Sequence, residues 1–168
     1  AGVRVPLVPM AHEYLVTQPF RDRDPARPLP TMRDPDLLVY FREDAGGLVM
    51  GGYERHSKPW ALDEDGVDAI PADFNGRLLE EDWERFEEIT VNARKRVPVM
   101  DEVTITRLIN GPEAFTPDGE FLLGESHVRG FFVAAGFCAH GLAGAGGMGK
   151  LIAEWIADGH ERRLITLP

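Results

Sequence analysis

The sequence has one cysteine, no long apolar run and no excess of basic residues, and each shortage excludes a class of protein. Cys138 is the only cysteine, so an internal disulfide or a metal site built from several cysteines is excluded. Lys and Arg number 18 against 28 Asp and Glu, and the net charge of -10 argues against nucleic-acid binding. No apolar run approaches the roughly 20 residues that span a bilayer. We therefore expect no nucleic-acid partner, no membrane partner and no metal.

The beginning of the chain also lacks features of a complete protein. It has neither an initiator Met nor a basic-then-apolar secretion signal, and residues 2–9 already resemble the middle of a fold. We expect an excised domain or a processed chain with one good core and an appendage. A single thiol fits a reducing compartment, so the expected location is the cytoplasm, or the mitochondrial matrix in a eukaryote.

Hydrophobic patterns predict a mixture of strands and helices. The clearest helix covers residues 80–97, because its apolar side chains recur every three or four positions and Pro98 ends it. A second helix is expected after Gly141, ending near Asp158 with Gly159 as its cap. Residues 110–123 carry Gly, Pro and Asp turn signals. Strands are expected at residues 12–18, at 37–41 and 48–53 as a hairpin, at 103–109, and at 131–135, buried on both faces.

The Gly-rich stretch 141–150 permits several interpretations. Residues 144–149 fit the dinucleotide spacing GxGxxG, but residues 136–143 separate them from the preceding strand, which this motif should follow directly. Residues 144–151 approach a phosphate-binding P-loop, but Leu151 stands where Ser or Thr should bind Mg²⁺. We favour glycines that allow close helix packing. A helix N-terminus aimed at a cofactor remains open.

Two strand residues are candidates for substrate contact. His12 and Tyr40 each lie on a predicted strand, and Tyr14 and Arg42 lie two positions beyond them and share their faces. A pocket with His, Tyr and Arg is suited to an amino acid, whose carboxylate Arg would bind. The alternative is that both residues are structural. Cys138 is expected to be a small loop residue rather than a nucleophile.

Composition and spacing indicate only a soluble α/β domain. The order of the sequence segments indicates, in addition, a particular family. Several blocks resemble the FAD-dependent dimethylglycine and sarcosine dehydrogenases and oxidases, members of the D-amino-acid-oxidase-like superfamily. These blocks are HEYLVT (12–17), LPTMRDPD (29–36), VYFRE (39–43), NGPEAFTPDG (110–119), LGE (123–125) and FFVAAGFCAHG (131–141).

This resemblance implies an α+β (α/β) fold in two parts. Residues 1–104 would form a largely antiparallel substrate-domain sheet that is flanked by helices and covers the flavin. Residues 105–168 would return to the FAD-binding domain as the C-terminal strand-turn-helix of a split Rossmann domain. The N-terminal motif that binds the ADP part of FAD is absent, so the missing portion of the parent chain is an expected partner and the isolated chain should be inactive.

The resemblance also implies a site and a reaction. The parent would oxidise an N-methyl amine such as sarcosine or dimethylglycine by hydride transfer to FAD, with His12 and Tyr40 on the substrate side. The turn that contacts the flavin would comprise Gly136, Phe137, His140 and Gly141. Ala143 stands where some relatives have a carboxylate-binding Lys, so either Arg33 or Arg42 would bind the substrate carboxylate or the substrate is a different one. The alternative is a regulatory or binding relative without turnover; a module that binds phosphate through residues 144–150 is weaker.

Overall fold

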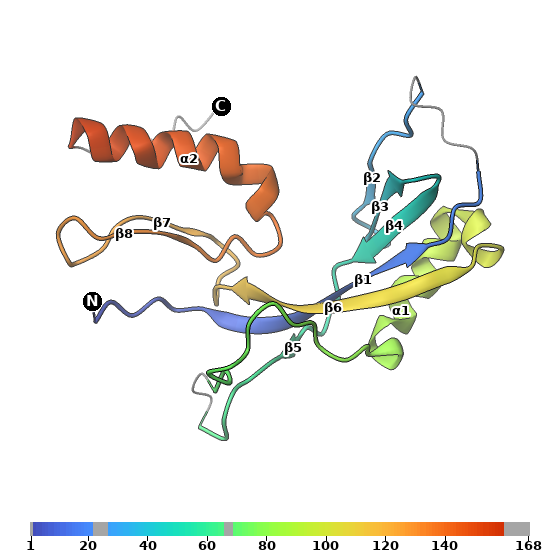
Figure 1. Cartoon of the computed structure of the whole chain (residues 1–168), viewed down its shortest axis with the longest axis horizontal. Coiled ribbons are helices and arrows are strands. Elements are labelled where there is room, and N and C mark those ends of the chain that lie inside the picture. The colour runs from blue at the N-terminus through green and yellow to red at the C-terminus, as the bar shows by residue number, and fades with distance from the viewer. Residues whose placement is uncertain (1, 22–26, 66–68, 160–168) are drawn as a thin grey trace. The chain divides into compact units, whose positions relative to one another are not determined.

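The computed structural model describes residues 2–21, 27–65 and 69–159 of a mixed α/β chain (Figure 1). The chain divides into two compact units, one of Ala11–Pro112 and one that joins Ala1–Met10 to Glu113–Pro168. The sequence predicted a boundary after residue 104. Strand β6 (Ile105–Phe115) begins directly after that residue, and the division between the two compact units falls inside β6, between Pro112 and Glu113. The roles predicted for the two parts stay predictions.

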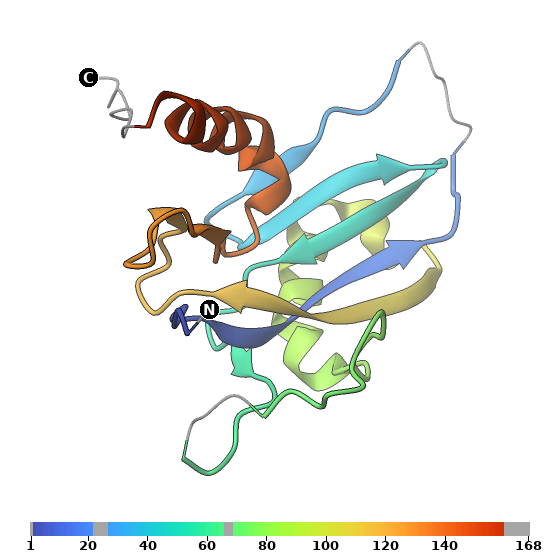
Figure 2. The same cartoon turned by 60° about the vertical axis from the view of Figure 1, so that its left-hand side comes forward.

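The larger unit is built on a mainly antiparallel sheet, as the resemblance predicted (Figure 2). Within the described ranges the sheet has six strands in the order β2-β3-β4-β1-β5, and β6 also pairs with β1. The neighbours β2 and β3, β3 and β4, and β4 and β1 all run antiparallel. The strand bounds are β1 Val8–Thr17, β2 Met32–Asp34, β3 Val39–Asp44, β4 Gly47–Gly52 and β5 Lys58–Pro59.

The helix α1 (Trp83–Arg96) covers one face of this sheet, and none of the unit's described helices lies on the other face (Figure 2). The core lies between α1 and the sheet, where Phe86 and Ile89 are almost fully buried. Gly52 allows the helix to approach closely, because a Cβ there would come within 2.6 Å of the Ile89 side chain. Side chains along β1 alternate between the two faces of the sheet. Glu13 and Leu15 are buried on the side of the helix, and Tyr14 between them faces away from it.

The ends of α1 confirm the helix predicted at residues 80–97. Asp82 is the N-cap, and its side chain accepts a hydrogen bond from the Arg85 N–H at 3.2 Å. At the other end the Val97 N–H donates to the carbonyl of Ala93 at 2.8 Å, and Pro98 begins the 3-10 turn η1 (Pro98–Asp101).

The predicted hairpin is confirmed as β3 and β4, whereas the strand predicted at residues 103–109 extends farther than predicted. Residues 110–115 continue β6 as a strand, with Gly111 and Pro112 inside it. β6 pairs with β1 on one side. A proline, which has no N–H to donate, is tolerated in such an outer strand. The chain turns only afterwards, at residues 117–119.

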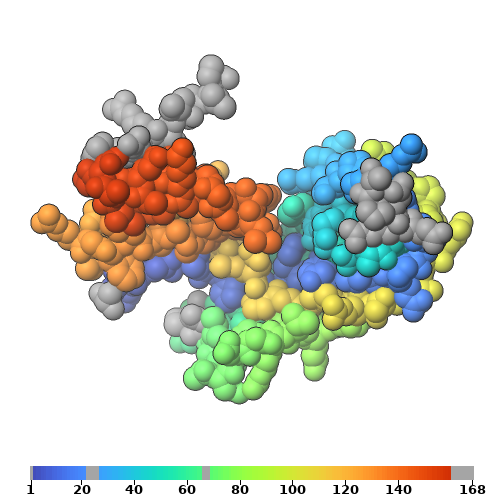
Figure 3. Space-filling model, turned by 45° about the horizontal axis from the view of Figure 1, so that its top comes forward, coloured from blue at the N-terminus to red at the C-terminus, as the bar shows by residue number. Residues whose placement is uncertain are grey.

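The smaller unit contains a two-stranded antiparallel sheet and one long helix, shown in orange and red in Figure 3. Its elements are β7 (Leu122–Glu125), β8 (Phe132–Ala135) and α2 (Gly141–Asp158). Trp155 of α2 packs edge-on against Phe132 with ring centres 5.9 Å apart. The predicted cap at Gly159 is confirmed by its φ of 71° and its N–H bond to the Trp155 carbonyl at 2.9 Å. The prediction that β8 is buried on both faces is wrong for this chain, because β8 pairs only with β7 here and stays partly exposed.

Candidate functional site

The uncovered face of the large sheet carries an aromatic row. The register places Tyr14 opposite Gly51, Gly51 opposite Tyr40, and Tyr40 opposite Arg33. Directly opposed residues of neighbouring strands point to the same face, so these four share one side. His12 lies two positions before Tyr14 on β1 and belongs to that side too. The structure therefore brings His12, Tyr40 and Arg33 together.

Tyr53 lies at the centre of this group. Its ring centre is 6.3 Å from that of His12 and 5.8 Å from that of Tyr40. The Arg33 guanidinium stacks over the same ring, 4.6 Å from its centre. All three tyrosines of the chain, Tyr14, Tyr40 and Tyr53, thus gather on the side of the sheet opposite α1.

The position of the Tyr40 ring depends on the glycine opposite it. A Cβ on Gly51 would collide with the ring and the hydroxyl of Tyr40, so the phenol lies over a strand position that only glycine leaves free. Burial raises the pKa of Tyr40 to about 12, with further contributions from Tyr53, Tyr14 and Glu54. At neutral pH this side chain is therefore an uncharged phenol that can donate a hydrogen bond.

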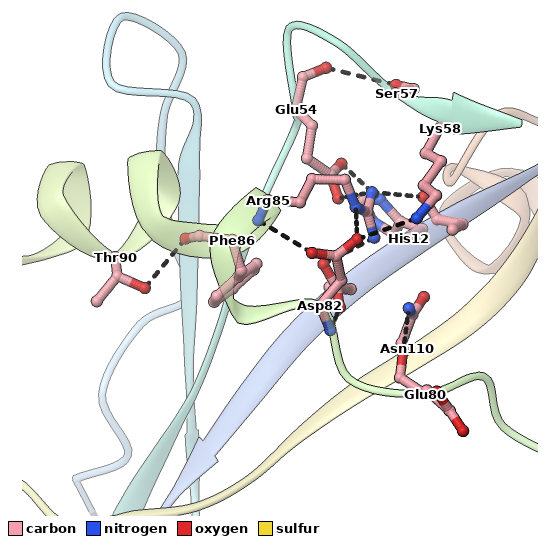
Figure 4. Close-up of polar contacts among 12 residues, drawn as sticks. His12, Glu54, Ser57, Lys58, Glu80, Asp82, Arg85, Phe86, Thr90 and Asn110 are labelled. Atoms are coloured by element: carbon pink, nitrogen blue, oxygen red, sulfur yellow. Dashed lines mark hydrogen bonds and ion pairs between the residues drawn. The ribbon is translucent and has the colours of Figure 1, made fainter.

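A buried charged cluster lies at the beginning of α1 (Figure 4). Its centre is Arg85, whose side chain is 11% exposed. The guanidinium contacts Glu13 at 2.7 Å, Glu54 at 3.0 Å and Asp82 at 3.7 Å, and it donates to the Ala11 carbonyl at 3.0 Å. A second bond fixes Glu13, which accepts from the Asp82 N–H at 2.9 Å. One arginine thus connects α1, β1 and the segment after β4.

The charged cluster reaches the aromatic face through Glu54. One carboxylate oxygen of Glu54 bonds Arg85, and the other lies 3.1 Å from Nδ1 of His12. The side chains of His12 and Glu54 are 15% and 6% exposed, so little water competes for this hydrogen bond. A carboxylate buried with Arg85 therefore holds the imidazole of His12.

The two buried glutamates respond differently to their surroundings. Burial opposes ionisation of Glu54, but the hydrogen bond with His12 and the charge of Arg85 outweigh it, so the pKa of Glu54 lies below its ordinary value. Burial dominates at Glu13 and raises its pKa, although the Asp82 N–H and Arg85 act in the opposite direction. Arg85 is the cation that contacts both glutamates, whereas the exposed Lys58 contacts Asp82 at 3.3 Å.

The two candidate arginines differ in placement. Arg33 stacks on the aromatic group, as described above. Arg42 also belongs to the aromatic side of β3 and is exposed like Arg33, but its side chain pairs with Asp44 at 3.6 Å rather than with an aromatic ring. Arg33 is therefore better placed than Arg42 to bind an anion beside Tyr40 and Tyr53.

The candidate flavin turn is a tightly held loop between β8 and α2. Gly136 has a φ of 68°, and a Cβ there would come within 2.7 Å of both Thr116 and Leu7. Cys138 and Ala139 also have positive φ, at 47° and 66°. Non-glycine residues rarely adopt this conformation, and they do so mainly where function or tight packing requires it.

Side-chain contacts hold this turn in place. The Ala139 N–H donates to Glu113 at 3.1 Å, and His140 Nδ1 lies 2.7 Å from the Cys138 carbonyl. The thiol of Cys138 is buried and donates to the Gly136 carbonyl at 3.1 Å. These contacts support a structural role for Cys138, since His140 bonds its carbonyl rather than its thiol. Phe137 stacks on Phe121 with ring centres 5.2 Å apart.

The beginning of α2 has the features of a site for a polar group. His140 is the N-cap but makes no side-chain capping bond, and the Gly144 N–H donates to the His140 carbonyl at 3.1 Å. The N–H groups of residues 141–143 precede the intrahelical bonds and point outward from the helix. Leu142 in this first turn is 98% exposed, while Phe137 lies beside Gly141 and Gly144. Such a helix end favours a negatively charged or hydrogen-bond-accepting ligand.

The helix excludes two interpretations of the Gly-rich stretch. Residues 144–150 all lie within α2. Their N–H groups therefore face back along the helix toward carbonyls four residues earlier, and they cannot cradle a phosphate as a P-loop does. The predicted alternatives of a P-loop and of a GxGxxG turn are both wrong. A Cβ on Gly146, Gly147 or Gly149 would meet no atom within 4 Å of the described chain, so the close-packing interpretation has no partner in this part of the chain.

The described residues contain no group of three or more His, Cys, Asp or Glu that could hold a metal ion. They also include no helix long and apolar enough to cross a membrane.

The chain belongs to the FAD dependent oxidoreductase family, whose model matches residues 1–155. Sarcosine dehydrogenase from Homo sapiens is 37% identical over 164 residues, which are 97% of this chain and 17% of that protein. Dimethylglycine dehydrogenase from Homo sapiens is 34% identical over 160 residues, or 94% of this chain and 18% of that protein. The family predicted from the sequence blocks is thereby confirmed.

A relative that is named as a regulatory subunit, not as a dehydrogenase, matches equally well. The pyruvate dehydrogenase phosphatase regulatory subunit from Mus musculus is 37% identical over 157 residues, covering 93% of this chain and 17% of that protein. All three relatives are described as mitochondrial. The chain thus spans about a sixth of the length of these relatives.

Solved structures confirm the fold. L-proline dehydrogenase from P. horikoshii superimposes with a TM-score of 0.71 at 22% identity, covering 96% of this chain and 38% of that one. Glycine oxidase from Geobacillus kaustophilus gives a TM-score of 0.67 at 20% identity, covering 97% and 38%. At these identities the likeness concerns the fold alone.

Replacing Arg85 tests the charged cluster. We expect Arg85→Met to lower the free energy of unfolding by about 3–5 kcal/mol at neutral pH, because Glu54 and Glu13 then remain buried without a cation. Without the arginine, the folded-state pKa of Glu13, which burial already raises, should rise further because the charge of Arg85 no longer opposes burial. The deficit should therefore be fully present at neutral pH and should shrink as the pH falls through that raised pKa. Urea unfolding at several pH values measures this difference.

Arg55→Met is the matched control, because Arg55 and Glu88 form an exposed pair with side chains 57% and 49% accessible. This change should alter the free energy of unfolding by no more than about 1 kcal/mol. Equal effects of the two replacements at neutral pH would contradict the importance given to the buried cluster.

Proposed function

We propose that the protein carrying this chain oxidises an N-methyl amine, such as sarcosine or dimethylglycine, by hydride transfer to FAD. The observation that supports it best is the uncovered sheet face, where His12, Tyr40 and Tyr53 lie together while α1 covers the opposite face. Two relatives are named as dehydrogenases of sarcosine and of dimethylglycine, which supports an N-methyl amine as the substrate. FAD, when bound, supplies the hydride acceptor.

Tyr40 and His12 would have different roles. The phenol of Tyr40, with its raised pKa, stays protonated and would donate a hydrogen bond to the bound substrate. It is therefore a poor proton acceptor, and that role falls to the imidazole of His12. An N-methyl amine must lose its ammonium proton before it can give up a hydride, so a positioned base raises the fraction of reactive substrate.

Arg33 would bind the carboxylate of an amino-acid substrate. Its guanidinium lies over Tyr53, next to the two candidate catalytic side chains. An amine at His12 and a carboxylate at Arg33 would orient the substrate at two points. Ala143 stands where the resemblance implies a lysine, so an amino-acid substrate would need a different carboxylate anchor, and Arg33 is the one we propose.

The turn of residues 136–141 and the beginning of α2 fit a flavin edge. Backbone N–H groups before the first intrahelical bond can donate to ring oxygens, and Gly141 leaves room for a close approach. A helix N-terminus also favours the negative charge of a reduced ring. Gly136, Phe137, His140 and Gly141 are the residues that would hold it, and their facing the sheet of the larger unit stays a prediction.

The chain alone should be inactive. The motif for the ADP part of FAD is not in the sequence, and that portion of the parent is the partner we propose. The protein would act in the cytoplasm, or in the mitochondrial matrix of a eukaryote, as the relatives described as mitochondrial support.

A regulatory or binding protein without turnover is the second candidate. The mouse regulatory subunit supports it, since it matches this chain as well as the dehydrogenases do.

Mixing the chain with FAD tests its proposed inactivity. We expect an unshifted flavin absorption spectrum and no bleaching when sarcosine is added without oxygen. A shifted spectrum together with reduction by sarcosine would show that residues 1–168 already suffice.

Substitutions in the full-length, flavin-loaded protein separate a catalyst from a regulator. In a catalyst, His12→Ala should slow flavin reduction by about 10²-fold or more and Tyr40→Phe by about 10-fold, because a proton acceptor and a hydrogen-bond donor are lost. Stopped-flow absorbance measures the rate. The exposed His56 provides the control variant His56→Ala, which should reduce flavin normally. A wild-type protein that reduces no flavin with any N-methyl amine supports the regulatory candidate.

The arginine assignment is tested with substrates that differ in their carboxylate. We expect Arg33→Met to weaken binding of sarcosine or dimethylglycine by about 10–100-fold, because a charged hydrogen bond is lost. Arg42→Met, the matched control, should change binding by less than about 3-fold. A dimethylamine without a carboxylate should bind wild type and Arg33→Met alike. Stronger loss at Arg42 than at Arg33 would reverse the assignment.

A further inference from the structure

We propose that Glu54 is a positioning residue that holds His12 in one orientation and in the Nδ1–H tautomer, so that Nε2 is the nitrogen available to the substrate. This inference rests on the proposed function for its chemical purpose. The hydrogen-bond geometry on which it depends can be examined without any flavin.

The first argument is the chemistry of the hydrogen bond. Oε2 of Glu54 lies 3.1 Å from Nδ1 of His12. An ionised carboxylate has only acceptor atoms, so Nδ1 must carry the hydrogen. The lowered pKa of Glu54 agrees with an ionised partner. Nε2 is then the lone-pair nitrogen, as in a neutral imidazole whose other nitrogen is bound to a carboxylate.

The second argument is that Glu54 is itself held firmly. Its other oxygen accepts from Nη1 of Arg85 at 3.0 Å, and the same Nη1 donates to the Ala11 carbonyl at 3.0 Å. The arginine thus fixes both the carboxylate and the backbone next to His12. Figure 4 shows Glu54, Arg85 and His12 converging, with Ser57 bonded to the Glu54 backbone carbonyl at 3.4 Å. A carboxylate with both oxygens engaged keeps one direction toward the ring.

The third argument is the placement of the ring on the aromatic side of the sheet. His12 lies beside Tyr53, which also contacts Tyr40 and Arg33. Among the residues that the structure describes, the polar contact of the ring is the one at Nδ1. Nε2 is therefore the ring atom that remains for a ligand on this face.

The consequence for the reaction is a proton transfer with a defined acceptor. The proton leaves the ammonium nitrogen of the substrate for Nε2, and the electron pair of the broken N–H bond stays on the substrate nitrogen. His12 becomes an imidazolium, and the Glu54 carboxylate stabilises its positive charge. A buried aspartate acts in the same way on the histidine of a serine protease.

The tautomer can be measured directly in the 168-residue chain. Long-range ¹H–¹⁵N spectra at a pH where the ring is neutral distinguish the protonated nitrogen from the lone-pair nitrogen, and His12→Gln identifies the signals. We expect Nδ1–H in the wild-type chain and in Glu54→Asp, which keeps a carboxylate. Glu54→Gln can donate its amide hydrogen to Nδ1 and should shift the ring toward Nε2–H.

Glu88→Gln is the control, because it removes an exposed carboxylate and should leave the His12 signals unchanged. An Nε2–H ring in the wild-type chain would overturn the proposal, and so would a His12 spectrum that Glu54→Gln leaves unchanged. The wild-type spectrum decides the tautomer even where Glu54→Gln fails to fold, which thermal unfolding would reveal.

The flavin-loaded full-length protein provides the second readout. Glu54→Gln should lower the limiting rate of flavin reduction by about 10–100-fold, as loss of an orienting partner does, with substrate binding changed by less than about 3-fold. Glu54→Asp should recover part of the rate. An unchanged rate in Glu54→Gln would overturn the positioning role. If the wild-type protein oxidises no amine, the proposed function is wrong. The NMR spectra of the chain still test whether Glu54 holds His12 in the Nδ1–H tautomer.

Discussion

The buried guanidinium of Arg85 is the contact on which the larger unit depends most. It is 11% exposed, and it joins Glu13 on β1, Glu54 after β4 and Asp82 at the start of α1. Removing these charges from water is costly, and the pairings with their extra backbone bonds offset that cost only when all partners are present. The cluster therefore specifies one position of α1 on the sheet. Because Glu54 also contacts His12, the same contact that orders the fold orders the candidate site.

Two neighbouring glycines on β4 give the sheet its two different faces. Gly52 points toward α1 and lets Ile89 approach, whereas Gly51 points the opposite way and leaves room for the ring of Tyr40. Alternation along a strand makes this possible, since adjacent residues face opposite sides. One face is consequently a packed core, and the other is an aromatic surface with a histidine and an arginine. The sheet therefore carries polar side chains on one side without weakening the hydrophobic packing on the other side.

The sequence was most informative where structure is local and least where it depends on distant partners. The helix before Pro98, the hairpin ahead of Gly52 and the cap at Gly159 follow from periodicity and turn chemistry, and all were predicted. Glu54, Tyr53 and Arg85 were missed, because their contacts join segments far apart in the sequence that no spacing reveals. The turn signals at residues 110–123 located a turn, but they placed the end of the preceding strand too early, since tertiary pairing extends β6 through Gly111 and Pro112. The segment order predicted the family, while the placement of His12 and Tyr40 on one face needed the register.

The central claim is that the aromatic side of the sheet covers the flavin ring. A crystal structure of the full-length protein with FAD bound tests it most directly. The claim predicts that the isoalloxazine lies against the side that carries Tyr40 and Tyr53. A flavin located on the α1 side of the sheet, or distant from both His12 and Tyr40, would contradict it.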